Sequence, residues 1–195
     1  MSHDLRLPEN THCHGRRRWA GDKGAELVEF ALVLPFLIVI SMAIFDFGSA
    51  LTTRDKLDNA AREGVRVAVN QDIIDLDQTS PASVQVIRDA VANYVTQAGL
   101  KTCTIGAAPT KSGNAWIWTY PLTGASSCTG KLLTIERAYT AGVVNGSTPI
   151  LTRVTLQYPY NFISFHRVVT LIAPGAKYGP TITMQVRSVM QNLTP

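Results

Sequence analysis

The sequence lacks the residue patterns that mark common catalytic sites. It contains no G-x-x-x-x-G-K-[ST] phosphate loop, no G-x-G-x-x-G dinucleotide motif and no H-E-x-x-H zinc motif. Beyond residue 14 the only histidine is His166, which is too little for a hydrolase site. We therefore expect a protein that is not an enzyme, needs no cofactor or metal, and acts on no small-molecule substrate.

Charge and cysteine are also scarce. The net charge of +4 lies partly in the N-terminal tail, and the rest of the chain has no basic stripe, so a nucleic-acid partner is not expected. The three cysteines include no C-x-x-C pair, which argues against a zinc site. A disulfide between Cys103 and Cys128 is the natural pairing if that half lies outside the cytoplasm. The alternative is two buried free thiols.

The first 23 residues have no apolar periodicity and are interpreted as an unstructured tail. The cluster His12-Cys13-His14 is expected to be a chance grouping in this tail. The run Arg16-Arg17-Arg18 is expected to keep this end in the cytoplasm.

One stretch, from Gly24 to Phe45, is too apolar for an ordinary surface element. Between Glu29 and Asp46 no residue is charged, and a helix over that interval spans roughly 24 Å, against about 30 Å of hydrocarbon. Extending the helix to Leu51 completes a membrane span and brings a carboxylate to the membrane boundary. An acid in that position is a functional candidate, because burying it in lipid costs free energy. Pro35 removes one helical hydrogen bond and is expected to permit a kink.

Three interpretations of this stretch remain open. A secretory signal would be cut after a small-x-small site, for which Gly48-Ser49-Ala50 could serve, and would release a soluble protein. A plain single-span anchor would leave the N-terminus intact and hold an extracytoplasmic binding domain. A prepilin-type segment would instead lose its basic leader just before the apolar helix.

The residues around the start of the stretch resemble a known family. Gly24-Ala-Glu-Leu-Val-Glu29-Phe30 is similar to the prepilin peptidase site of the tight-adherence (Tad) pilus system, and its continuation Ala31-Leu-Val-Leu-Pro35 resembles the TadE-like pseudopilins. Asp46-Phe47-Gly48 and Asn59-Ala-Ala-Arg-Glu-Gly-Val-Arg66 extend the resemblance. Glu26 departs from the pattern, since that position is more usually small and neutral.

The resemblance implies a minor pseudopilin that helps to initiate, prime or cap assembly of a Tad-type pilus. The peptidase would cut between Gly24 and Ala25, with Glu29 and Phe30 serving recognition and assembly. The implied partners are the prepilin peptidase, the major pilin, a second TadE-like or TadF-like pseudopilin and the inner-membrane platform. The protein would be held in the bacterial inner membrane, with its N-terminus cytoplasmic, and would lie in the pilus or at its base.

The organisation expected is a leader over 1–24, a transmembrane helix over 25–51 and an extracytoplasmic domain over 52–195. The helix is predicted to continue as an amphipathic segment to Val69, because apolar residues keep helical spacing among charges. These residues are Phe47, Leu51, Leu57, Ala61, Val65 and Ala68.

A second helix is predicted after a turn that contains three acidic residues. Asp72, Asp75 and Asp77 lack the spacing of a calcium loop, so a solvated turn is expected. Ser80 is predicted as the cap, Pro81 as the first helical residue, and Gly99 as the end. The buried stripe would comprise Val84, Ile87, Val91, Tyr94 and Ala98.

Beyond Lys101 the residues favour strands, because β-branched and aromatic side chains alternate between Gly, Pro and Asn breaks. Strands are predicted over 114–122, 131–144, 150–158 and 181–190, with a turn at Asn145-Gly146. The apolar segment 162–173 is too short to span a bilayer, and core packing is favoured for it and for Tyr158 and Tyr160 over a membrane or partner contact. The predicted fold is α+β and pilin-like: a long N-terminal helix, a second helix and a small antiparallel sheet.

Overall fold

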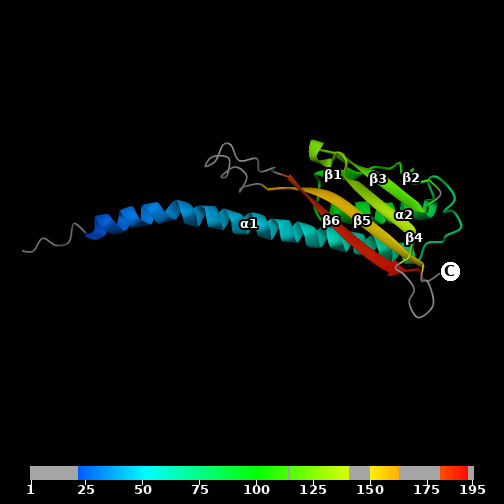
Figure 1. Cartoon of the computed structure of the whole chain (residues 1–195), viewed down its shortest axis with the longest axis horizontal. Helices are drawn as coiled ribbons and strands as arrows, with labels where there is room; N and C mark the ends of the chain where they lie inside the picture. The colour runs from blue at the N-terminus through cyan, green and yellow to red at the C-terminus, as the bar shows by residue number, and fades with distance from the viewer. Residues whose placement is uncertain (1–21, 114, 141–149, 163–180, 193–195) are drawn as a thin grey trace, which may run out of the picture. The chain divides into compact units, whose positions relative to one another are not determined.

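The computed structural model describes residues 22–113, 115–140, 150–162 and 181–192. These residues form two α-helices, a short 3-10 helix and six strands (Figure 1). In chain order the elements are α1 (Asp22–Val69), α2 (Ala82–Gln97), β1 (Cys103–Ile105), β2 (Thr110–Lys111), β3 (Ile117–Gly124), η1 (Ser126–Cys128), β4 (Leu132–Thr140), β5 (Ile150–Asn161) and β6 (Thr181–Gln191). The predicted α+β class is confirmed.

The chain divides into two compact units, Met1–Ser41 and Met42–Pro195. In the first unit, the described residues are helical. The second unit holds the remainder of α1, α2 and the sheet. The predicted boundary after Leu51 is the end of a membrane span, which is a different boundary from the one between these two units. It stays a prediction.

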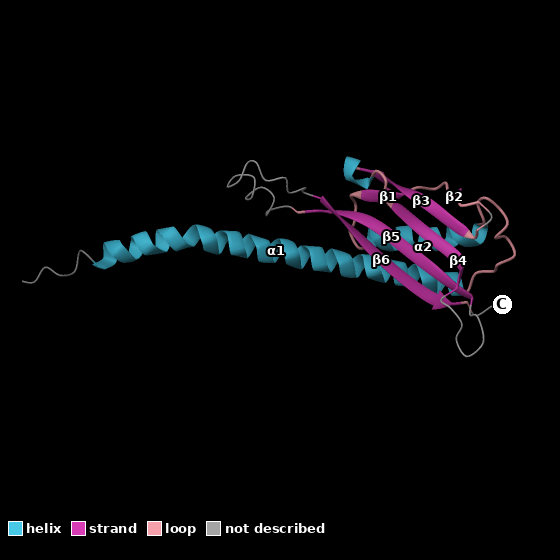
Figure 2. Ribbon diagram, in the orientation of Figure 1, coloured by secondary structure: helices cyan, strands magenta, loops and turns pink. Residues whose placement is uncertain are grey.

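The sheet is antiparallel, with strand order β1-β3-β4-β5-β6 and β2 paired to β3 (Figure 2). Its alternation follows the sequence closely. On β3, Trp118, Tyr120 and Leu122 are buried, and the residues between them are more exposed. Because β-strand side chains alternate between faces, this pattern shows that one face of the sheet is buried, and the helices pack against that face. The core joins residues from both helices to this face.

At the start of the amphipathic part of α1, the buried residues differ from the predicted ones. Phe47 and Leu51 are 67% and 58% exposed, so their predicted place on the buried stripe is wrong. The buried positions there are Asp46 and Ala50, one turn apart. Further along, Leu57, Ala61, Val65 and Ala68 are buried as predicted.

Helix α2 begins one residue later than expected. Pro81 is its N-cap, and no side chain caps from that position. Instead, the Asp75 carboxylate accepts hydrogen bonds from the Ser83 N–H at 2.9 Å and the Ser83 hydroxyl at 2.6 Å. The predicted role of Ser80 is therefore wrong, because a carboxylate from the preceding turn supplies the acceptor.

The C-terminal end of α2 agrees with the sequence. Gly99 has a φ of 80°, a conformation that glycine adopts without strain. Its N–H donates to the Thr96 carbonyl at 3.1 Å, and the Leu100 N–H donates to the Val95 carbonyl at 3.1 Å. These two bonds form a Schellman motif, which ends the helix.

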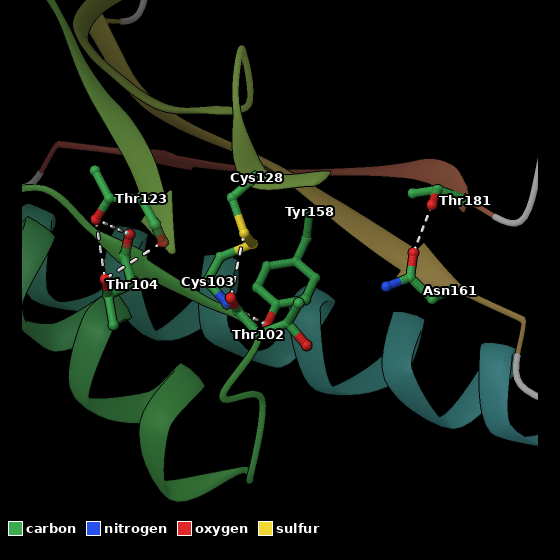
Figure 3. The surroundings of a disulfide bond; sticks show 8 residues. All are labelled: Thr102, Cys103, Thr104, Thr123, Cys128, Tyr158, Asn161 and Thr181. Atoms are coloured by element: carbon green, nitrogen blue, oxygen red, sulfur yellow. Dashed lines mark hydrogen bonds between the residues drawn. A yellow bond between two sulfur atoms is a disulfide. The ribbon is translucent and has the colours of Figure 1, made fainter. Parts of the chain in front are cut away.

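Cys103 and Cys128, the pair expected from the sequence, form a disulfide with a Cα–Cα distance of 5.8 Å. It ties β1 to η1 beside the buried Tyr158 (Figure 3). The Tyr158 hydroxyl accepts a hydrogen bond from the Cys103 N–H at 3.2 Å. At the end of β3, Gly124 has a φ of 128°, and a Cβ there would lie 2.7 Å from the Thr102 carbonyl oxygen. The crosslink therefore closes the end of a tightly packed strand pair.

Some sequence predictions lie outside the described residues. They are the tail over 1–21 with its cluster at 12–14 and arginine run at 16–18, the end of the predicted strand 131–144 beyond residue 140, the turn at 145–146, and the part of the apolar segment 162–173 that follows residue 162.

Candidate functional site

The predicted processing residues lie on the first turns of α1. Gly24, Ala25, Glu29 and Phe30 are all helical and exposed. Ala25 precedes Glu29 by four residues, which is about one helical turn or 6 Å. The structure thus places the Glu29 carboxylate one turn beyond the atom that would become a new N-terminus if the chain were cut after Gly24.

The apolar part of α1 exposes its side chains in all directions. Leu27, Phe30 and Phe36 are each more than half exposed, and α1 carries one segment long and apolar enough to cross a membrane. Exposed apolar surface on this scale is compatible with lipid and not with water. The chain is therefore consistent with a single-pass membrane protein. Helix α1 continues through Pro35, so this proline does not end the helix.

The glycines of α1 differ in their surroundings. A Cβ on Gly24 would meet no heavy atom within 4 Å, and the same is true of Gly48. Local packing therefore gives no reason for glycine at position 24.

Gly64, in contrast, lies where α1 meets α2 and β5. A Cβ at this position would be 2.6 Å from Cγ2 of Val91 and 3.4 Å from Cγ1 of Val154. Its neighbours Ala60, Ala61 and Val65 are also buried. The 59–66 block therefore contributes a face of small side chains that lets the helix approach the sheet closely.

We expect Gly64→Ala to lower the free energy of unfolding by about 2 kcal/mol, because the new methyl group overpacks the core. Thermal unfolding of the full chain in detergent, followed by circular dichroism, measures this change. Gly48→Ala is the matched control, since its methyl group enters open space and alanine favours the helix by up to about 1 kcal/mol. Equal melting temperatures for the two variants would contradict the packing role of Gly64.

The opposite face of the same block carries charged residues that pair along the helix. Asp58 and Arg62 are 2.8 Å apart, and Glu63 and Arg66 are 2.7 Å apart. The hydrogen bonds that Arg66 donates to the Glu63 carboxylate lower the pKa of Glu63, and the same bonds raise the pKa of Arg66. These pairs are solvent-exposed and contribute little to stability.

Asp46 is buried against the end of β5. The Tyr160 hydroxyl donates a hydrogen bond to the Asp46 backbone carbonyl at 3.2 Å. Burial raises the pKa of Tyr160, and the Asp46 carboxylate raises it further. Phe162 packs edge-on against Tyr160, with ring centroids 5.3 Å apart. Tyr158 and Tyr160 are buried, so the prediction of core packing is confirmed for them.

Arg137 of β4 holds the C-terminal end of α1, a contact that the sequence analysis missed. Its side chain is buried, and its guanidinium donates to the backbone carbonyls of Ala68, Gln71 and Asp72. The last carbonyls of a helix have no partner within the helix and carry the negative end of its dipole. Burial lowers the pKa of Arg137, and Asp75 opposes that shift.

Residues of the turn between α1 and α2 make hydrogen bonds that hold the fold together. Lys111 donates to the carbonyls of Leu76 and Asp77 at 2.8 and 2.9 Å, and Asp75 caps α2. Among the described residues, no group of three or more His, Cys, Asp or Glu side chains is arranged to hold a metal ion.

Comparison with known proteins matches the N-terminal part of the chain to one family. The family model described as TadE-like protein matches residues 24–66, from Gly24 through the apolar helix to Arg66. This match confirms the resemblance seen in the sequence motifs. No curated protein matches the chain, and no solved structure matches it.

Proposed function

From the TadE-like segment we propose that this chain is a minor pseudopilin of a Tad-type pilus, cut by a prepilin peptidase after Gly24. It would remain in the inner membrane and help to initiate, prime or cap pilus assembly. The observation that carries the proposal is the position of the family match, which begins at Gly24. That glycine opens an exposed apolar helix and has no packing role of its own.

Processing would create a charge pair suited to assembly. A cut after Gly24 gives Ala25 a free amine, and Glu29 lies one turn further along the helix. In an assembly of parallel helices, the Glu29 carboxylate of one subunit would pair with the Ala25 amine of its neighbour. Pairing offsets the cost of holding both charges in an apolar layer.

The proposed topology places the basic leader in the cytoplasm and the second unit outside it. Arg16–Arg18 favour a cytoplasmic N-terminus, because basic residues flanking a span remain on that side. The Cys103–Cys128 disulfide supports an extracytoplasmic domain, because disulfides persist in oxidising compartments.

The proposed partners follow from this role. They are the prepilin peptidase, the major pilin, a second TadE-like or TadF-like pseudopilin and the membrane platform of the pilus. The exposed apolar face of α1 would meet lipid before assembly and other helices during assembly.

We expect Gly24→Ile to block processing, because a branched side chain hinders entry of the backbone into a protease cleft. Expressed in a host with a Tad-type pilus system, the wild-type chain would lose 24 of its 195 residues, about one eighth of its mass. The variant would keep them. Gel mobility of C-terminally tagged chains distinguishes the two products.

Gly48→Ile is the matched control for that experiment, because Gly48 is equally open but lies far along α1 from the cut. It should be processed as the wild type is. A wild-type chain of full length would refute processing, and would favour an unprocessed anchor that carries an extracytoplasmic binding domain.

A further inference from the structure

The outermost strand of the sheet, β6, has an open edge. All eleven residues from Thr181 to Gln191 pair with β5 on one side, and no other strand in the described part of the chain pairs with the other side. Natural sheets protect such an edge with proline, lysine, inward-pointing charges or a short strand. Strand β6 has none of these features, and its one charged residue is Arg187.

The orientation of the free backbone groups follows from one hydrogen bond. The Asn192 N–H donates to the Ile150 carbonyl at 3.1 Å, in register with the β5–β6 ladder. In an antiparallel pair the residues alternate between bonding inward and outward. The even-numbered residues of β6 therefore bond to β5. The odd-numbered residues, Thr183 to Val189, direct their N–H and C=O groups to the open edge.

An apolar groove lies beside this edge on the helix side. Phe47 and Leu51 of α1 line it together with Ile182 and Met184 of β6, and its volume is about 320 Å³. Phe47, Leu51 and Ile182 are 67%, 58% and 41% exposed. A strand added to β6 would cover this groove with every second side chain, because those side chains point to the helix face.

The one charged residue of the groove lining and the one charged residue of β6 are both arginines. Arg54 lines the groove and Arg187 lies on the other face of β6. In the part of the chain that the structure describes, neither guanidinium forms a salt bridge. The groove lining contains no carboxylate. An added strand that carries an acidic side chain would supply the missing partner.

We propose that the β6 edge binds an extended, acidic segment of a partner protein by strand addition. An extended chain would satisfy the unpaired backbone groups of β6. Its alternate apolar side chains would fill the groove, and a carboxylate on its other face would pair with Arg187. This inference goes beyond the proposed role in assembly, because it assigns a surface and the chemistry of its partner.

A second copy of the chain fits the edge poorly. Within the second unit, Leu51 of α1 lies beside Ile182, at the start of β6. The C-terminal end of α1 lies toward the other end of β6, because Arg137 binds the Ala68 carbonyl and its own backbone carbonyl accepts a hydrogen bond from the Asn192 side chain at 3.4 Å. Antiparallel pairing of two β6 strands would separate the two Leu51 ends by roughly 30 Å along the strands. Two copies in one membrane, as the proposed function requires, would not meet in this way.

The test uses the full chain in detergent micelles and a fluorescent nine-residue peptide that begins with Thr, alternates Thr with Val, and has Glu in place of the central Thr, on the face opposite the Val side chains. Fluorescence anisotropy should detect saturable binding. Gln185→Pro should weaken binding at least tenfold, because proline removes an outward N–H and leaves the bonds to β5 intact. Gln185→Ala, which keeps that N–H, should bind as the wild type does.

Two further arms keep the test decisive if the proline variant fails to fold. A peptide with alternate backbone amides N-methylated should not bind the wild-type chain. Arg187→Glu should weaken binding of the Glu peptide and strengthen binding of a peptide with Lys at that position. Absence of saturable binding, or binding indifferent to N-methylation and to the charge exchange, would overturn the proposal. So would a dimer in sedimentation that Gln185→Pro dissociates, since the occupant would then be a second copy.

Discussion

Replacing Arg137 with methionine is expected to lower the free energy of unfolding by about 4 kcal/mol. The arginine is buried, and its guanidinium donates to the carbonyl of Ala68 in the last turn of α1 and to the carbonyls of Gln71 and Asp72 in the turn that follows. Methionine fills similar volume but donates no hydrogen bond. The Gln71 carbonyl then loses the Arg137 donor, and the Ala68 carbonyl keeps only the bond from the Gln71 N–H, in a site that water reaches poorly. For a chain of this size, the melting temperature should fall by roughly 12 °C.

Two control variants separate this effect from a general loss of charge. Arg187→Met removes an exposed arginine that forms no salt bridge with the described residues, and should change stability by less than about 0.5 kcal/mol. Arg137→Lys keeps the charge but replaces the planar guanidinium with a single ammonium group. Its free energy of unfolding should lie between those of the wild type and the methionine variant. A methionine variant within about 1 kcal/mol of the wild type would show that Arg137 does not hold the end of α1.

Removing the disulfide is expected to have the next largest effect. The crosslink closes a loop of 25 residues, and chain-entropy arguments assign such a loop roughly 3.5 kcal/mol. The double variant Cys103→Ala and Cys128→Ala should lose about this much, as should the wild type after reduction. Thermal unfolding with and without a reducing agent measures the loss.

Cys13→Ala is the control for the disulfide, because this third cysteine lies in the leader. It should leave the melting temperature of the chain unchanged. Alkylation of the unfolded, unreduced protein gives an independent check: neither Cys103 nor Cys128 should react. Labelling of either residue without a reductant, or a double variant as stable as the wild type, would contradict the crosslink.

The regular elements could be predicted because their patterns are local. The alternation at Trp118 and Tyr120 identified β3, and Gly99 identified the end of α2, since a single residue in the left-handed region ends a helix. The motif on which the proposed processing site rests could also be recognised, because its residues are consecutive in the sequence. The family match over 24–66 covers them all.

The contacts that were missed join residues far apart in the chain. Arg137 stands where strand alternation expects an apolar side chain, and its burial makes sense only once the end of α1 is known to lie beside it. Asp75 replaced Ser80 as the cap of α2 for the same reason. Phe47 and Leu51 were placed on the wrong face because the buried stripe begins with a carboxylate, Asp46, which an apolar pattern does not recognise.

The most direct measurement of the central claim is N-terminal sequencing of the mature protein isolated from membranes of a host with a Tad-type pilus system. Processing at the TadE-like site predicts a chain that begins at Ala25, with or without a methyl group on its amine. A chain that begins at Met1 would contradict the account and indicate an unprocessed anchor. A chain that begins near Leu51 and is free of membranes would also contradict it, and would indicate a secreted protein.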